Sequence, residues 1–431
     1  MITEKLYNIG QKLFPVNRSI TGHGTVKTLR VLKSIVPKLK IKKIKSGKKI
    51  FDWLVPPEWN VNDAFVEDKF GDKIIDIKNN NLHLVGYSSP AKLLMDKSNL
   101  LKKLNSLEKQ PNAIPYMTSY YKKYWGFCVT ENQKKLIKKK YKDSDMFKVK
   151  IDSNFNKKGS LTYGEILIPG KSKKEILIST YICHPQMANN ELSGPLVTIA
   201  LAKYFSKKKN KKTIRFIFIP ETIGAIAYIK KNLTHLKKNI IGGYVLTCIG
   251  DEKNYSFLST KYNNTNSDFA AEKAFRECKI KYKKYSFLKR GSDERQFNSC
   301  GVDLPIASIM RTKYGEYKQY HTSLDDFNLV TRKGLNGGFK IAKKSIENLL
   351  NYIIPKSVIV CEPKLQKKNL YESLSTKFNS KKKKLSIKIL NFLQYADGKN
   401  NLENISRFIN LPLKQTKKLY KILLRYNLID N

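Results

Sequence analysis

The sequence predicts an α/β protein built on a doubly wound sheet that helices cover on both faces. Four apolar runs have the length and the β-branched content of buried strands: "EILIST", "TIRFIFI", "GGYVLTCI" and "DLPIASIM". Segments with helical spacing alternate with these runs: they start at Ser193 and near Thr222, cover about 266–278 and 293–300, and end with "RKGLNGGFKIAKKSIENLLNYI". This alternation is typical of a sheet between two helical layers, where ligands gather at the carboxyl ends of the strands.

Two other kinds of sequence precede this unit. Residues 1 to about 40 contain two stretches with helical spacing, "EKLYNIGQKLF" and "GTVKTLRVLKSIV", joined by the turn-forming stretch "PVNRSITGHG". From about residue 48 to residue 120, short alternating, aromatic and β-branched runs are broken by Pro, Asn and Gly. This part of the chain predicts a small β-rich module.

The C-terminal residues 380–431 predict a third module. "LSIKILNFLQYADG", "NLENISRFI" and "LPLKQTKKLYKILLRYNLI" have the size of three helices with short turns, as in a winged-helix or helix-turn-helix unit. The third helix carries a basic stripe of Lys414, Lys418, Lys421 and Arg425. This stripe either contacts the phosphates of a nucleic acid or is the solvated face of a lysine-rich helix. The module could also mediate oligomer formation.

The composition favours a globular protein of two or three domains, because 431 residues with 41% hydrophobic content can bury a large core. The net charge of +48 does not by itself indicate nucleic-acid binding, since ten of the 83 basic residues are arginine and the lysines are spread along the chain. No apolar stretch approaches the roughly 20 residues that cross a membrane, and the N-terminus has no signal-peptide pattern. Six cysteines occur singly, so we expect a reduced, cytoplasmic protein.

Ionisable residues follow the predicted strands. His184 comes after the first strand, Glu221 after the second and Asp251 after the third, while Asp293 lies in "RGSDERQF" and His321 in "EYKQYHTSLDD". Two neutral imidazoles with one or two carboxylates form a zinc site that keeps a position open for water. A nearby carboxylate such as Glu221 can take a proton from this water and pass it to a leaving amine.

Each of these residues also has a structural interpretation. A histidine at a strand end can be a hydrogen-bonded core residue, and Glu221 and Asp293 can stabilise the first turns of the helices that follow them. Asp325 or Asp326 could orient His321 through its far ring nitrogen. The order of the residues along the chain favours the metal site, and the individual residues leave both interpretations open.

The succession "STYICHP…ANNELSGP", "IPETIG", "RGSDERQF…GVDLP" and "YHTSLDD" resembles the zinc aminopeptidase superfamily, which includes bacterial aminopeptidases and glutaminyl cyclases. "LFPVNRSITGHGTVKTL" and "DWLVPPEWNV" resemble a bacterial aminopeptidase-like branch whose members often occur with surface-polysaccharide biosynthesis genes. The resemblance covers essentially the whole chain. It implies a mixed, doubly wound sheet of zinc-aminopeptidase type in residues 1–47 and 121–360, an inserted β-rich domain in 48–120 and a winged-helix domain in 380–431.

The sequence departs from the superfamily at three carboxylates. The resemblance places Asn190, Thr222 and Thr247 where the superfamily has metal-binding carboxylates. A pair of zinc ions needs that negative charge to stay close together. The resemblance therefore implies at most one zinc ion, and it disfavours the glutaminyl-cyclase reaction, which uses some of the lost carboxylates.

The metal site that the resemblance implies holds one zinc ion for hydrolysis of an amide. His184 and His321 are its ligands, Glu191 or Asp293 supplies a carboxylate, and Glu221 is the general base. The substrate is a peptide or a small molecule that contains an amide, such as a derivative of a sugar. The alternative is a non-catalytic regulatory or binding protein that binds a ligand with the aminopeptidase fold and contacts DNA or a partner through the winged helix.

Overall fold

The computed structural model describes residues 1–371 and 381–430 of the chain. These residues form two compact units, Met1–Ile346 and Glu347–Asn431. Among the described residues, no helix is long and apolar enough to cross a lipid bilayer. The predicted start of the winged-helix domain at residue 380 lies outside the described residues.

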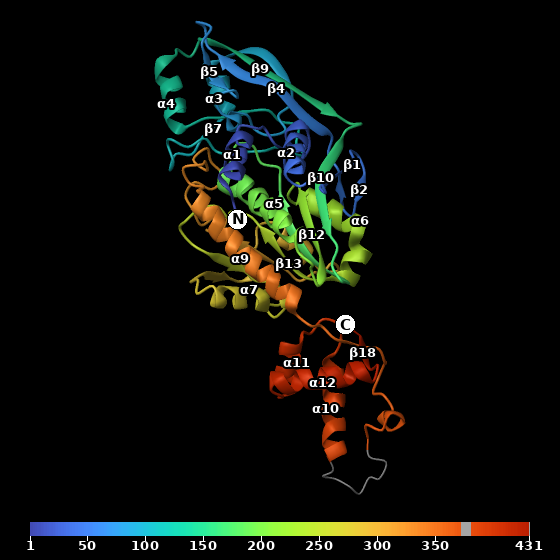
Figure 1. Ribbon diagram of the computed structural model, residues 1–431. Helices are drawn as coiled ribbons and strands as arrows, with labels where there is room; N and C mark the ends of the chain where they lie inside the picture. The colour runs from blue at the N-terminus through green and yellow to red at the C-terminus, as the bar shows by residue number, and fades with distance from the viewer. Residues whose placement is uncertain (372–380, 431) are drawn as a thin grey trace. The chain divides into compact units, whose positions relative to one another are not determined.

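An eight-stranded mixed sheet forms the centre of the first unit, in the order β1-β10-β12-β11-β13-β16-β14-β15. Its strands β10, β12 and β13 are labelled in Figure 1. The four central strands β12, β11, β13 and β16 are parallel, and antiparallel pairs join them to β10 and to β14. The predicted doubly wound mixed sheet is therefore confirmed. The strands are β1 (Lys40–Lys45), β10 (Ser160–Ile168), β11 (Ser172–Tyr181), β12 (Lys212–Ile219), β13 (Ile240–Leu246), β14 (Ser256–Leu258), β15 (Lys283–Tyr285) and β16 (Ile306–Met310).

Helices lie on both faces of this sheet because its crossovers run in both directions. The connection through α5 (Ser193–Phe205) leads from β11 to β12, whereas α6 (Ile223–Asn239) leads from β12 past β11 to β13. Right-handed connections therefore place α5 and α6 on opposite faces. α5 is apolar almost all round because it packs between the sheet and two N-terminal helices. The remaining helices of this layered core are α1 (Glu4–Leu13), α2 (His23–Ile35), α7 (Asn266–Glu277), α8 (Glu294–Phe297) and α9 (Arg332–Asn351).

A second sheet, in the order β5-β4-β9-β6, covers the region predicted to be β-rich. The predicted end of the β-rich domain at residue 120 stays a prediction. Strand β9 (Met146–Asn156) of this sheet lies beyond that residue. One continuous apolar core includes Phe147 and Val149 of this sheet together with Ile217 and Ile219 of the main sheet. The other strands of this second sheet are β4 (Glu58–Glu67), β5 (Lys73–Asp76) and β6 (Ala91–Asp96). Two further pairs of strands lie in this part of the chain: β2 (Lys49–Ile50) with β3 (Trp53–Leu54), and β7 (Leu104–Asn105) with β8 (Phe127–Cys128). Its helices are α3 (Lys97–Lys102) and α4 (Glu131–Lys140).

The second unit contains the three predicted helices, α10 (Lys381–Tyr395), α11 (Leu402–Phe408) and α12 (Leu413–Arg425). A two-stranded ladder of β17 (Lys356–Ser357) and β18 (Ile429–Asp430) accompanies them. Their apolar faces enclose a separate core that includes Phe392, Ile405 and Leu423. This arrangement confirms the predicted winged helix.

Candidate functional site

Two predicted site residues follow neighbouring parallel strands. His184 comes after β11 and Glu221 after β12, where Tyr181 and Ile219 are paired. Nε2 of His184 lies 3.7 Å from Oε2 of Glu221. This distance is too long for a hydrogen bond, and it places the carboxylate of Glu221 beside the ring nitrogen that Glu191 does not contact. The side chain of Glu221 is 21% exposed, so solvent reaches the site from this side.

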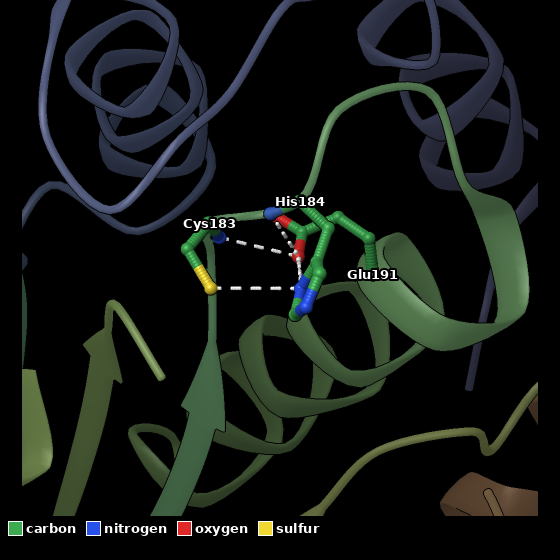
Figure 2. Close-up of side chains that lie close together, drawn as sticks. All are labelled: Cys183, His184 and Glu191. Atoms are coloured by element: carbon green, nitrogen blue, oxygen red, sulfur yellow. Dashed lines mark hydrogen bonds and ion pairs between the residues drawn. The ribbon is translucent and has the colours of Figure 1, made fainter. Parts of the chain in front are cut away.

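Glu191 contacts the other ring nitrogen of His184. It belongs to a π-helical turn, Ala188–Leu192, a kind of turn that is frequent at functional sites. Its Oε2 accepts hydrogen bonds from Nδ1 of His184 (3.1 Å) and from the backbone N–H groups of Cys183 (3.2 Å) and His184 (3.0 Å), as Figure 2 shows. Since a carboxylate only accepts, Nδ1 of His184 carries a proton, and Nε2 is the ring nitrogen that faces Glu221.

Arg18 neutralises Glu191 in the interior. Its Nε lies 3.1 Å from Oε1 of Glu191, and both side chains are fully buried. The same Nε donates to the carbonyl of His184 at 2.9 Å, and Nη1 donates to the carbonyl of Leu13 at 2.7 Å. Arg18 was not among the predicted site residues. Its one signal in the sequence is that arginine is rare in a chain with 83 basic residues.

Asp293 lies on the other side of Glu221. Its Oδ1 accepts a hydrogen bond from the backbone N–H of Thr222 at 2.7 Å, and Oγ of Ser292 donates to Oε1 of Glu221 at 2.8 Å. Burial and the neighbouring Glu221 raise the pKa of Asp293 well above its usual value, and burial also raises the pKa of Glu221. Arg295 donates to Oγ1 of Thr222 at 2.5 Å and brings a positive charge close to both carboxyl groups.

His321 lies near His184, on the loop between β16 and α9. Its ring centroid lies 5.6 Å from that of His184, and Tyr116 makes edge contacts with both rings, at 5.2 Å and 5.1 Å. Tyr320 stacks on His321 at 3.9 Å. Burial, and then the neighbouring His184, lower the pKa of His321 to about 3. His321 is therefore neutral at physiological pH, which is the form that binds metals.

Asn190 and Thr247, two of the three neutral residues singled out by the sequence resemblance, are joined through Tyr181 into a hydrogen-bonded chain. Oγ1 of Thr247 donates to the hydroxyl of Tyr181 at 2.5 Å, and this hydroxyl donates to Oδ1 of Asn190 at 2.8 Å. All three residues are almost completely buried. The chain is uncharged, so it offers no carboxylate to a second metal ion.

Three aspartates near the site have structural partners. Oδ1 and Oδ2 of Asp325 accept the backbone N–H groups of Asn189 (2.5 Å) and Asn190 (2.9 Å), and Asp326 accepts hydrogen bonds from Asn328. Asp251 accepts hydrogen bonds from Thr312 and from the side chain of Asn189. The structure therefore uses Asp325 to fix the π-helical turn.

Among the described residues, one trio has ligand atoms that all lie within 4.8 Å of one another: Cys183, His184 and Glu191. Its chemistry suits a metal poorly. Burial, with Glu191 and Glu221 next in importance, raises the pKa of the Cys183 thiol well above its usual value, so the thiol keeps its proton. The charge of Glu191 is already balanced by Arg18.

A second group of candidate ligands, His184, His321 and Asp293, is better suited chemically, although among the described residues their ligand atoms do not all lie within 4.8 Å of one another. His321 presents a neutral ring, and Oδ2 of Asp293 is a buried carboxyl oxygen without a hydrogen-bond partner among the described residues, although its raised pKa means that a cation would have to displace its proton. Buried polar atoms are rarely left unpartnered, so this oxygen fits the site of an ion. His321 and Asp293 each lie more than 4.8 Å from at least one of His184 and Glu221, so an ion held by all three proposed ligands would require these side chains to move closer together.

Comparisons with known proteins agree with this architecture. Residues 7–351 match a family described as a domain of unknown function (DUF4910), and residues 353–431 match a winged helix-turn-helix family. A protein of Clostridium acetobutylicum is 39% identical over 432 residues, which cover 99% of this chain and 96% of the relative. That relative is provisionally named a polysaccharide biosynthesis protein with an aminopeptidase-like domain.

Solved structures show the same fold. A crystal structure from Clostridium acetobutylicum, provisionally named a peptidase, is 38% identical, covers 99% of this chain and 96% of that chain, and has a TM-score of 0.78. A zinc aminopeptidase from Bacillus subtilis is 11% identical, covers 80% of this chain and 95% of its own, and has a TM-score of 0.58. A peptidase M28 precursor from Shewanella amazonensis is 12% identical, covers 84% of this chain and 95% of its own, and has a TM-score of 0.55. The chain belongs to the DUF4910 family, whose aminopeptidase-like domain is followed here by a winged helix-turn-helix domain.

Proposed function

We propose that this protein is a metal-dependent amide hydrolase with a single zinc ion. The observation that carries the proposal is the pairing of His184 and Glu221, whose facing atoms lie 3.7 Å apart at the ends of two parallel strands. The zinc aminopeptidase of Bacillus subtilis supports the same chemistry, since it shares the fold. The substrate is a peptide or an amide on a sugar derivative, and the provisional name of the Clostridium relative favours the latter.

The residues have distinct roles in this proposal. Nε2 of His184 and the ring of His321 hold the ion together with Asp293. Glu191 orients His184 instead of binding the metal, because its Oε2 accepts three N–H groups and the charge at its Oε1 is offset by Arg18 at 3.1 Å. A bound zinc ion supplies Lewis acidity to a water molecule and to the amide carbonyl.

Glu221 acts on the protons of the reaction. It takes a proton from the attacking water and delivers it to the leaving nitrogen, which is the usual role of a carboxylate beside a catalytic metal. The hydroxyl of Ser292 holds Oε1 of Glu221 at 2.8 Å, so Oε2 is the oxygen directed at the reaction. Burial raises the pKa of Glu221 and so makes its carboxylate a stronger base.

The test of this proposal is the zinc content of purified protein after reconstitution. We expect about one zinc ion per chain in the wild type and less than about 0.2 in the His321→Ala variant, because three protein ligands are needed for a stable site. His23→Ala is the control, since the ring of His23 is 85% exposed on α2. Equal zinc contents in all three proteins would contradict the ligand role of His321, and a wild type without zinc would contradict the proposal.

A second candidate function is binding of nucleic acid by the winged helix. α12 buries Thr416, Leu419 and Leu423 and exposes Lys414, Lys418, Lys421 and Arg425 on its surface. An exposed row of cations on a helix fits the phosphates of a duplex. The C-terminal match to a winged helix-turn-helix family supports this candidate.

The salt dependence of DNA binding tests this second candidate. Replacing Lys414, Lys418 and Lys421 by Gln is expected to reduce the slope of log K against log salt by about 0.9 for each lost phosphate contact. Fluorescence anisotropy with a 20-base-pair duplex measures this slope. The matched control replaces Lys38, Lys43 and Lys45, which are exposed in the first unit. The same slope for both triple variants would exclude a specific role of α12.

A further inference from the structure

A buried chain of contacts joins the first loop of the protein to the candidate metal site. Arg18 lies in the stretch "PVNRSITGHG" between α1 and α2, far from His184 in sequence. Its Nε lies 3.1 Å from Oε1 of Glu191, and Oε2 of Glu191 accepts the Nδ1 proton of His184 at 3.1 Å. The side chains of Arg18 and Glu191 are 0% exposed and that of His184 is 5% exposed, so all three contacts are shielded from solvent.

The backbone of the site is held by the same groups. Nε of Arg18 donates to the carbonyl of His184 at 2.9 Å, while Glu191 accepts the N–H groups of Cys183 and His184. His184 is thus held at its carbonyl, at its amide and at one ring nitrogen. The other ring nitrogen, Nε2, faces Oε2 of Glu221 at 3.7 Å.

The loop that carries Arg18 is itself anchored. Oγ1 of Thr21 is hydrogen-bonded to the hydroxyl of Tyr87 at 2.5 Å and accepts the backbone N–H of Trp59 at 3.0 Å. Thr25 donates to the carbonyl of Ser19 at 2.7 Å and closes the loop onto the first turns of α2. The smaller sheet therefore fixes the position from which Arg18 reaches the site.

A buried ion pair is seldom explained by stability alone. Removing two charges from water is costly, and replacing such a pair by apolar residues of similar size is often neutral or stabilising. The chain also uses arginine sparingly, in ten of 83 basic positions. Nε of Arg18 contacts both Glu191 and His184, and Nη1 contacts Leu13, which a guanidinium can do because its donors point in fixed, different directions.

We propose that Arg18 is a positioning residue of the metal site. It holds Glu191 in place, and Glu191 in turn fixes His184 with the proton on Nδ1 and with Nε2 free to bind the ion. Partners of this kind orient metal-binding histidines and set their basicity. The effect on metal binding rests on the proposed function, whereas the effect on the protonation of the ring does not.

The experiment replaces the ion pair by apolar residues of similar size, Arg18→Met with Glu191→Leu. This double variant leaves no unpaired buried charge, so we expect it to fold. Competition with a chelating dye is expected to show zinc binding about 10- to 100-fold weaker than in the wild type. Arg18→Lys keeps the positive charge and loses the forked arrangement of guanidinium donors, and it is expected to retain part of the zinc affinity. Arg30→Met is the control, because Arg30 is exposed on α2.

Nitrogen NMR of the metal-free protein labelled with ¹⁵N-histidine is the second readout. In the wild type, His184 is expected to give the signals of a ring protonated at Nδ1, and in the double variant the proton is expected to shift toward Nε2. If the wild type binds no zinc, the proposed function is contradicted. The NMR comparison would still show whether Arg18 fixes the protonation of His184. A folded double variant with unchanged His184 signals and zinc affinity would overturn the proposal. So would a double variant that fails to fold, since the pair would then be structural.

Discussion

Replacing Glu221 by Gln is expected to lower kcat/KM for amide hydrolysis by a factor of about 10²–10⁴ while zinc stays bound. The amide keeps the size of the side chain and its contact with Ser292, and it removes the base that takes the proton from water. Release of 4-nitroaniline from a series of amino-acid 4-nitroanilides measures the rate. Zinc content determined on the same samples separates lost chemistry from a lost ion.

The control for this variant is Glu316→Gln. Glu316 is exposed and lies on the loop that also carries His321, so the same change of charge occurs close to the site without touching it. We expect its rate to stay within about twofold of the wild type, because exposed substitutions rarely have large effects. A Glu221→Gln variant with wild-type activity would exclude Glu221 as the general base.

Arg215→Met is expected to lower the free energy of unfolding of the protein by about 3–5 kcal/mol. Arg215 lies on β12, and its Nε and Nη2 donate to the two carboxylate oxygens of Glu175 at 2.7 Å and 3.0 Å. Its Nη1 contacts Glu165 at 2.5 Å. Removing the guanidinium leaves two nearly buried carboxylates without their main partner, which is the costly way to break such a network.

Urea unfolding followed by circular dichroism measures this loss of stability. Arg276→Met is the control, since Arg276 is exposed on α7, and we expect a change within about 0.5 kcal/mol. A triple variant that also replaces Glu165 and Glu175 by Gln is expected to recover part of the loss, because the unpaired charges are gone. A loss below about 1 kcal/mol for Arg215→Met would show that solvent screens the network.

The fold could be predicted where burial alone determines the pattern. The strands β11, β12 and β13 are covered on both faces, so their sequences are continuously apolar and stand out. The edge strand β1, "KIKKIK", escaped prediction because lysines occupy four of its six positions, as is common at sheet edges. β9 has Phe147, Val149 and Ile151 at alternate positions, and this signal for a strand was available in the sequence.

The candidate site could be predicted in part for a related reason. Parallel strands end at the same edge of a sheet, so His184 and Glu221 were expected to meet, and they do. The contacts of Arg18 and Tyr116 could not be predicted in this way. They come from a distant loop and from the region around the smaller sheet, and their approach depends on tertiary packing that no local pattern encodes.

The neutral chain of Thr247, Tyr181 and Asn190 has a consequence for substitutions at its two ends. An aspartate at position 190 or 247 alone would bury a charge beside a phenol that is already hydrogen-bonded. Each single substitution is therefore unfavourable by itself. The shared hydroxyl of Tyr181 makes positions 190 and 247 interdependent, so the effects of substituting them are not expected to add.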